Sequence, residues 1–199
     1  DTDIASEMIR GRPTAPYMVG EVKTDASAAT NIENLYACGE VASTGLHGAN
    51  RLGSNSLLEG LVFGRIAGNT AGENARRRAV TQAKPVRIEY NIPQSERTRL
   101  DTADVKNSLL ALMWRNVGIT RREKPLSEAQ EIIRFWQRYV MDKVFETPAG
   151  WQCQNMLTLA LLMATAARTR KESRGVHFRQ DYPEPDDKNF KNHIETHLP

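Results

Sequence analysis

Apolar residues recur with different periods along the chain, and its first part combines short runs with one long helical pattern. Residues 18–24 and 32–41 mix β-branched, apolar and glycine residues, which predicts two short strands. A helix is predicted to begin at Ser54 or Asn55, both good N-caps, and to run to about Gly72. The apolar residues on one side of this helix are Leu57, Leu58, Leu61, Val62 and Ile66.

Glycine recurs every fourth residue along this helix, at Gly60, Gly64 and Gly68. A glycine inside a helix costs about 1 kcal/mol relative to alanine. Three of them on one face therefore predict that another backbone packs very close to the helix.

Beyond this helix the pattern changes to a linker followed only by helices. Residues 79–99, with Pro85 and Pro93, are predicted to be a linker or an extended crossing. The sequence then predicts one helix from Asp101 or Thr102 to Gly118. Two more follow, one opening at Ser127 after Pro125 and one spanning about 151–171, which is apolar nearly all round and is predicted to be central in a small bundle.

The helical spacing also predicts which side chains face inward in this bundle. The inward positions are Val105, Leu109, Leu112, Met113, Ile132, Ile133, Trp136, Tyr139 and Val140. Trp114, Trp136 and Trp151 lie on or beside such stripes, so we expect them to be core anchors, the alternative being cofactor stacking. The fold class is α/β plus α, with a first part over 1–78, a linker over 79–99 and a helical domain with an extended tail over 100–199.

Composition narrows the class of protein. The 199 residues are 40% hydrophobic and 26% charged, so the chain can bury a core, and no apolar run predicts a membrane span or a secretory signal. We expect a cytoplasmic protein. The net charge of +3 and pI near 9.0 suit an anionic small molecule as well as nucleic acid, but the basic run at 76–78 lacks interleaved aromatics and indicates a solvated helix end.

Cys38 and Cys153 lack metal-binding neighbours and are predicted to be buried, reduced thiols, with no metal site.

The chemistry-bearing residues gather in the stretch GEVASTGLHGANRLGSNSLLEG, residues 39–60. Glu40 follows a predicted strand, where a carboxylate can accept from the two hydroxyls of a nucleotide ribose, although capping a turn explains it equally well. The backbone amides of Asn55, Ser56 and Leu57 open the long helix and can stabilise negative charge on a flavin ring, the alternative being an ordinary capped helix.

Two side chains just ahead of this helix add positive charge. Arg51 places a guanidinium at the same helix end, where it would attract a carboxylate. His47 can bind the same anion or serve as a structural histidine bonded to backbone. No catalytic residue is assigned.

Together these residues resemble the C-terminal flavin-binding segment of the succinate dehydrogenase, fumarate reductase and L-aspartate oxidase flavoprotein family. A second motif, RKESRGVHFRQDYPEPDD over 170–187, resembles the end of the helical domain in the same family. Within the family, the short helical domain and the MLTLALLMATAARTRKESRG stretch are most similar to L-aspartate oxidase. The resemblance implies the C-terminal part of a capping and FAD-binding, Rossmann-like domain over 1–78, followed by a three-helix bundle.

The resemblance also implies a function. The cofactor would be FAD, bound by Glu40 at the ribose and by Ser56 and Leu57 at the flavin edge, and Arg51 would bind a substrate carboxylate. The enzyme would oxidise L-aspartate to iminosuccinate in de novo NAD synthesis, with oxygen or fumarate as acceptor and a quinolinate synthase as partner.

The chain departs from the family pattern at several points. It has neither the GxGxxG fingerprint nor the family's mid-chain catalytic arginine, so we expect a C-terminal piece of a longer flavoprotein. Pro16 stands where the family has a substrate-binding histidine, and Glu21 where it has glycine. Proline offers no side-chain donor, and a glutamate facing the site would repel a dicarboxylate.

Two further functional hypotheses remain beside the L-aspartate oxidase one. The chain could belong to the flavoprotein subunit of a succinate dehydrogenase or fumarate reductase, which needs an iron–sulfur partner, or to a non-catalytic remnant that acts as a helical interaction module. In the tail, alternating charges at Arg170, Lys171, Glu172, Arg174 and Asp181 predict an ion-pair network docking the tail on the flavin domain. The alternative for the tail is catalytic, with His177 facing the active site.

Overall fold

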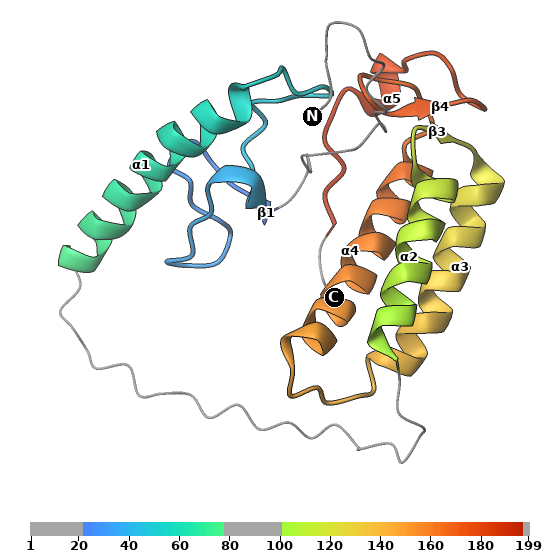
Figure 1. The fold of residues 1–199 in the computed structure, drawn as a ribbon. Coiled ribbons are helices and arrows are strands. Elements are labelled where there is room, and N and C mark those ends of the chain that lie inside the picture. The colour runs from blue at the N-terminus through green and yellow to red at the C-terminus, as the bar shows by residue number, and fades with distance from the viewer. Residues whose placement is uncertain (1–21, 78–100, 197–199) are drawn as a thin grey trace, which may run out of the picture. The chain divides into compact units, whose positions relative to one another are not determined.

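The computed structural model describes residues 22–77 and 101–196 and divides the chain into two compact units, residues 1–84 and 85–199 (Figure 1). The described part of the first unit contains β1 (Val22–Lys23), the 3-10 turn η1 (Gly39–Val41), β2 (Ala42–Ser43) and α1 (Asn55–Arg77). The described part of the second contains α2 (Thr102–Val117), β3 (Thr120–Arg121), α3 (Glu123–Val140), α4 (Pro148–Thr169), β4 (Phe178–Arg179) and α5 (Asp187–Phe190). The predicted linker lies outside the described residues, so the division at 79–99 stays a prediction.

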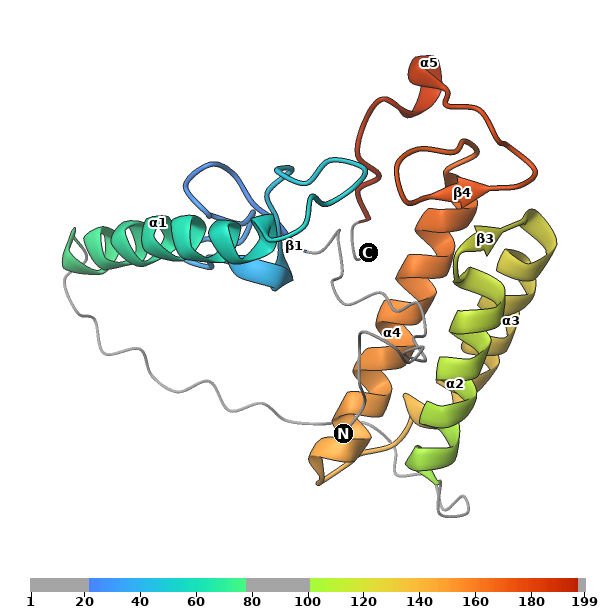
Figure 2. The same cartoon turned by 45° about the horizontal axis from the view of Figure 1, so that its top comes forward.

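In the first unit, α1 runs beside a compact arrangement of turns and two short parallel strands (Figures 1 and 2). Val22 pairs with Ala42 and Lys23 with Ser43. The prediction of a strand over 32–41 was wrong. Residues 32–34 form a turn, Tyr36 makes a single antiparallel bridge with Ala29, residues 39–41 form η1, and the strand follows at Ala42.

The glycine stripe of α1 is used at one of its three positions. A Cβ at Gly60 would lie 3.9 Å from the Cα of Gly39, so η1 packs directly on this turn of the helix. At Gly64 and Gly68 a Cβ would meet no atom of the described residues within 4 Å. Close backbone packing is therefore confirmed at Gly60 only.

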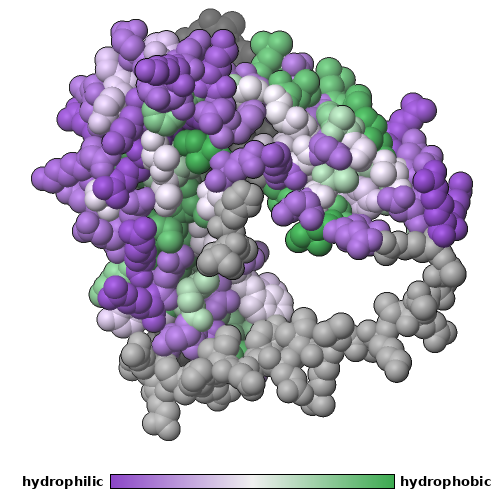
Figure 3. Space-filling model, turned by 180° about the vertical axis from the view of Figure 1, so that it is seen from behind, coloured by the Kyte–Doolittle hydropathy of each residue, from purple (hydrophilic) through white to green (hydrophobic). Residues whose placement is uncertain are grey.

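The apolar side of α1 is exposed in the described part of the first unit. The exposed side chains are Leu57, Leu58, Leu61 and Val62, of which Leu57 is 76% exposed. Figure 3 shows the first unit with apolar surface on its outside. The residues of α1 that are buried are instead Glu59 and Ala67.

In the second unit, α2, α3 and α4 form a bundle in which each helix packs on the other two (Figure 2). Asp101 caps α2 by accepting from the backbone amides of Ala103 and Asp104, at 2.9 and 3.3 Å. Its predicted end at Gly118 is confirmed. The helix predicted to open at Ser127 in fact begins at Glu123.

The two later helices both begin earlier than predicted, and each has a proline in its first turn. Pro125 lies in the first turn of α3 and Pro148 is the first residue of α4, positions whose amides need no intrahelical partner. Pro125, which was expected to precede the helix, is therefore part of α3.

The core of the bundle follows the predicted spacing closely. The fully or almost fully buried residues include Leu109, Leu112, Ile133, Val140, Leu157 and Ala164. Trp136 packs against this core as expected, but Trp114 and Trp151 are 44% and 51% exposed, so the core-anchor prediction was wrong for these two. Tyr139 is likewise 42% exposed. Cys153 is buried and Cys38 only half-buried, and neither forms a disulfide.

Candidate functional site

The predicted site residues of the first unit lie around one loop, residues 44–54, which joins β2 to α1. Local turns shape this loop. The amide of Gly48 donates to the carbonyl of Gly45 at 3.2 Å, and that of Asn50 donates to the carbonyl of His47 at 3.3 Å. The amide of Asn55 then donates to the carbonyl of Leu52 at 3.2 Å, so the loop turns directly into the helix.

Arg51 lies at the N-terminal end of α1, as the sequence predicted. Its Nη1 donates to the Oγ of Ser56 at 3.1 Å. The first-turn amides of a helix lack intrahelical acceptors and carry the positive end of the helix dipole. A guanidinium and these amides therefore form a positively charged helix end that suits an anionic ligand.

His47 makes a contact that the sequence did not predict. Its side chain is only 7% exposed, and Nε2 donates to Oε2 of Glu59 at 2.7 Å. The other carboxylate oxygen of Glu59 accepts from the hydroxyl of Thr44. The Nε2 of His47 therefore binds a carboxylate of this unit rather than the backbone, and the binding of a substrate anion by His47 stays a prediction.

Glu59 and Thr44 were missed as members of this site. Glu59 is 2% exposed, although it belongs to an otherwise apolar helical run, SLLEGLVFG. A charged side chain in such a run is rarely fully buried unless it is paired, so the sequence did carry the signal. The spacing alone could not name its partners, because they come from the preceding loop.

Glu40 lies in η1, which packs on α1 beside Gly60. Its side chain is exposed, so the carboxylate is accessible to a ligand. The structure therefore brings η1, with Glu40, against the helix whose first turn carries Asn55, Ser56 and Leu57. Leu57 is exposed, and Asn55 and Ser56 are half-buried.

The tail of the second unit holds a dense network of charges. Glu172 is fully buried and accepts from Arg170 Nη1 at 2.6 Å, from Arg174 Nη2 at 2.9 Å and from the amide of Asp186 at 2.7 Å. The hydrogen bond from Arg174 is the main cause that lowers the pKa of Glu172 to about 2. This carboxylate therefore stays ionised at neutral pH.

Arg179 is the second buried charge of this network. Its guanidinium donates to both oxygens of Asp181, at 2.8 and 2.9 Å, and to the carbonyls of Ala167 and Arg168, each at 3.0 Å. The same side chain lies over the ring of Tyr182, 5.0 Å from its centroid. Arg179 thus joins the tail to the C-terminal end of α4.

His177 was expected either to face an active site or to be structural. Arg121 donates to its Nδ1 at 2.7 Å, and its Nε2 donates to the carbonyl of Arg170 at 3.1 Å. Burial and the neighbouring arginines lower the pKa of His177, which keeps the ring neutral. Both ring nitrogens are engaged within the second unit.

The contacts described for the predicted network also lie within this unit. Arg174 binds Glu172 and Asp187, and Asp181 binds Arg179 and the amide of Glu123. Lys171 is exposed. The ion-pair network is confirmed, whereas its docking on the flavin domain stays a prediction.

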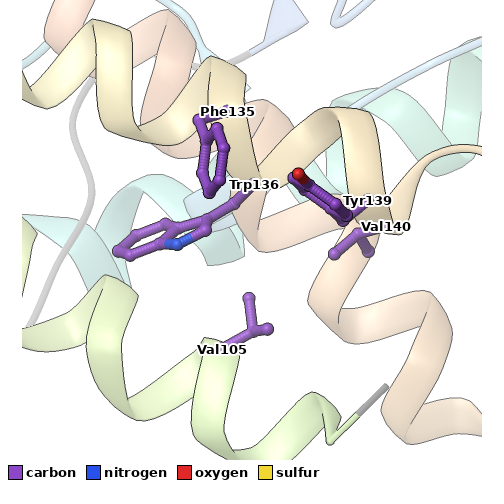
Figure 4. A pocket seen from close by; sticks show the side chains of 5 residues that line it. All are labelled: Val105, Phe135, Trp136, Tyr139 and Val140. Carbon is purple, nitrogen blue, oxygen red and sulfur yellow. The ribbon is translucent and has the colours of Figure 1, made fainter. Parts of the chain in front are cut away.

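An apolar hollow of about 220 Å³ lies at the surface of the bundle. Val105 of α2 and Phe135, Trp136, Tyr139 and Val140 of α3 line it (Figure 4). Apart from the hydroxyl of Tyr139, its lining offers no group for acid–base chemistry or for binding an anion. The hollow therefore lacks the charged groups that a dicarboxylate site needs.

Both units match models of known protein families. Residues 1–57 match the family model described as FAD binding domain, and residues 106–197 match the one described as fumarate reductase flavoprotein C-term. An L-aspartate oxidase from Nostoc is 36% identical over 205 residues, covering 91% of this chain and 35% of the relative. A fumarate reductase flavoprotein subunit from Mycobacterium tuberculosis is 35% identical over 216 residues, covering 98% and 37%.

The chain belongs to the succinate dehydrogenase and fumarate reductase flavoprotein family. A solved structure of the E. coli quinol fumarate reductase is 32% identical with a TM-score of 0.71, covering 90% of this chain and 34% of that one. The chain therefore spans about a third of the length of the relatives that it matches. Its mostly helical fold with few short strands agrees with a segment of their FAD-binding and helical domains.

FAD is the cofactor of this flavoprotein segment, since the FAD binding domain match includes η1, the loop and the start of α1. The side chains present fit FAD. The first-turn amides of Asn55, Ser56 and Leu57 at the N-terminus of α1 suit an electron-rich ring edge, and exposed Glu40 suits ribose hydroxyls. Pro16 and Glu21 lie outside the described residues. Over residues 22–77 and 101–196, no helix has the length and apolarity needed to cross a membrane.

Proposed function

We propose that this chain contributes to an FAD-dependent enzyme that oxidises L-aspartate to iminosuccinate in de novo NAD synthesis. The observation that carries the proposal is the pairing of Arg51 with Ser56 at the start of α1, 3.1 Å apart, which gives a cationic anchor beside a helix N-terminus. A dicarboxylate needs such an anchor to be held at a flavin. Similarity to the Nostoc L-aspartate oxidase supports the choice of substrate.

Each residue of the site has a defined part in this proposal. Arg51 binds one substrate carboxylate through its guanidinium fork, and its bond to Ser56 fixes the direction of that fork. The first-turn amides of Asn55, Ser56 and Leu57 face the cofactor's pyrimidine edge, and Glu40 accepts from its ribose. FAD, when bound, supplies the two-electron oxidation, and oxygen or fumarate reoxidises it.

A second function is favoured by a specific observation. The fumarate reductase flavoprotein subunit of M. tuberculosis is as similar to this chain as the L-aspartate oxidases are. In that case the natural substrate pair is succinate and fumarate, and the protein needs an iron–sulfur partner. The same Arg51 anchor serves both functions because both substrates are four-carbon dicarboxylates. A non-catalytic remnant is the third hypothesis.

The experiment that separates these functions is an anaerobic titration of the full-length, FAD-loaded protein. L-aspartate is expected to bleach the visible absorbance of the oxidised flavin, while D-aspartate, which has the same charge and the opposite configuration, is expected to leave it unchanged. Bleaching by succinate alone would assign the reductase function. If neither L-aspartate nor succinate bleaches the flavin, the result would support the hypothesis of a non-catalytic remnant.

The proposal extends to the product and its location. Iminosuccinate is an imine of an oxo acid, and imines hydrolyse readily in water, so we propose direct consumption by a quinolinate synthase in the cytoplasm. Mixing the purified proteins in the presence of the three-carbon co-substrate that quinolinate needs beyond the four carbons of iminosuccinate is expected to raise the yield of quinolinate. The comparison is the yield obtained when the filtered product of the first enzyme is added to the synthase and the same co-substrate afterwards. An equal yield in both arrangements would count against direct transfer.

A further inference from the structure

We infer that Glu59 is a positioning residue for substrate binding: its buried carboxylate fixes the loop that carries Arg51. The inference rests on the proposed function of Arg51 and concerns a residue of α1 that the proposed function does not use. Glu59 lies one helical turn after Asn55, the first residue of α1. Its side chain is 1% exposed.

The carboxylate of Glu59 connects two points of the loop to the helix. Oε1 accepts from the hydroxyl of Thr44, the first loop residue, and Oε2 accepts from Nε2 of His47 at 2.7 Å. Thr44 Oγ1 also accepts from the amide of Leu46 at 3.3 Å. One buried carboxylate therefore orders residues 44–47, a segment that ends four residues before Arg51.

The loop needs this restraint because its backbone is unusually permissive. Gly45 and Gly48 have φ values of 83° and 54°, in the region that glycine enters without cost. Glycine also loses the most conformational entropy on ordering, so a glycine-rich loop depends on side-chain bonds to keep one conformation. The bonds to Glu59 hold its start, and the bond from Arg51 to Ser56 holds its end.

A positioning role and a simple electrostatic role of Glu59 predict opposite changes in dicarboxylate affinity when Glu59 is removed. Glu59 lies next to a helix end that binds an anion in the proposed function, so by charge alone its removal would strengthen dicarboxylate binding. If Glu59 instead keeps Arg51 in place, the removal of Glu59 weakens dicarboxylate binding. A guanidinium without a fixed position loses its aligned contact with a carboxylate. The direction of the change therefore tests the inference.

The test is the dissociation constant of malonate, a redox-inert dicarboxylate, for the FAD-loaded full-length protein, measured by flavin difference spectra and by calorimetry. For Glu59→Ala we expect this constant to rise about tenfold or more with FAD still bound. Glu59→Gln keeps one acceptor oxygen and is expected to fall between the wild type and Glu59→Ala. Glu73→Gln, at an exposed glutamate of the same helix, is the matched control and is expected to leave the constant unchanged.

The outcomes separate this inference from the proposed function. Arg51→Ala is measured alongside. If it weakens malonate binding while Glu59→Ala leaves it unchanged or makes it tighter, Glu59 is not a positioning residue and the function of Arg51 stands. If Arg51→Ala has no effect on malonate, the proposed function of Arg51 itself is wrong.

Two milder variants keep the test informative if Glu59→Ala does not fold. Thr44→Val and His47→Asn each remove one side chain that donates to Glu59 and leave the carboxylate in place. Each is expected to raise the malonate dissociation constant by a smaller factor than Glu59→Ala would. Unchanged malonate binding in both variants, with FAD bound, overturns the inference.

Discussion

Nη1 of Arg179 lies 3.0 Å from the carbonyl oxygen of Ala167, so a buried side chain of the tail binds the last turn of α4. The tail strand β4 that carries Arg179 pairs with β3, which follows α2, and the carboxylate of Asp181 accepts from the amide of Glu123 at the start of α3. The tail thus contacts all three bundle helices or their ends. Its charged sequence motif has a structural explanation within the second unit.

Arg179→Ala is expected to destabilise the second unit by about 3–5 kcal/mol, because it removes the buried guanidinium that donates to both oxygens of Asp181 and to two backbone carbonyls. The measurement is the free energy of unfolding of the full-length protein in urea. Arg134→Ala, at an exposed arginine of α3, is the control and is expected to change it by under about 0.5 kcal/mol. Equal effects of the two variants would contradict the role given to Arg179.

The stability of the second unit is expected to fall in acid. Arg174 holds the pKa of Glu172 at about 2, below its ordinary value of 4.5, and Arg179 holds that of Asp181 at about 2 against 3.8. A lowered pKa stabilises the fold above the ordinary value, and this contribution is lost as pH falls towards 2. Urea unfolding between pH 6 and 2, followed by circular dichroism, measures it.

Glu172→Gln is expected to flatten this acid dependence, since the variant has one fewer carboxylate to protonate in that range. Glu131→Gln, at an exposed position of α3, is the matched control and is expected to keep the wild-type slope. A Glu172→Gln slope equal to that of the wild type would show that Glu172 is not a source of the acid sensitivity.

Leu157→Ala is expected to cost about 2–5 kcal/mol, because Leu157 is fully buried in the bundle core and its loss leaves a cavity. Leu159 lies on the same helix, is 44% exposed and serves as the control. Chemical unfolding of both alanine variants compares them directly. A loss for Leu159→Ala as large as that for Leu157→Ala would mean that the bundle packs differently from the structure described.

Much of the second unit was predictable from its sequence because the signals are local. The i, i+3, i+4 spacing identified Leu109, Leu112, Ile133 and Val140 as core, and Asp101 followed by helical residues identified a cap. Trp114 and Trp151 were misjudged because a position beside an apolar stripe does not say how far the neighbouring helix extends.

The first unit was less predictable because its order depends on contacts distant in the sequence. Its two strands, β1 and β2, are two residues long each, too short for alternation to show. Residues 32–41 form a turn, one isolated bridge and η1 instead of a strand. The positions of Arg51 and Ser56 at the helix start followed from the sequence, whereas the pairing of Glu59 with Thr44 and His47 needed the folded loop.

The central claim, that Arg51 at the start of α1 binds a substrate carboxylate, is tested most directly by steady-state kinetics of Arg51→Ala in the full-length protein. Arg65→Ala, at an exposed arginine of the same helix, is the control. We expect Arg51→Ala to lower kcat/KM for L-aspartate about 100-fold, with a raised KM and full FAD content, and Arg65→Ala to match the wild type. Unchanged kinetics for Arg51→Ala, or loss of FAD instead of substrate affinity, would contradict the claim.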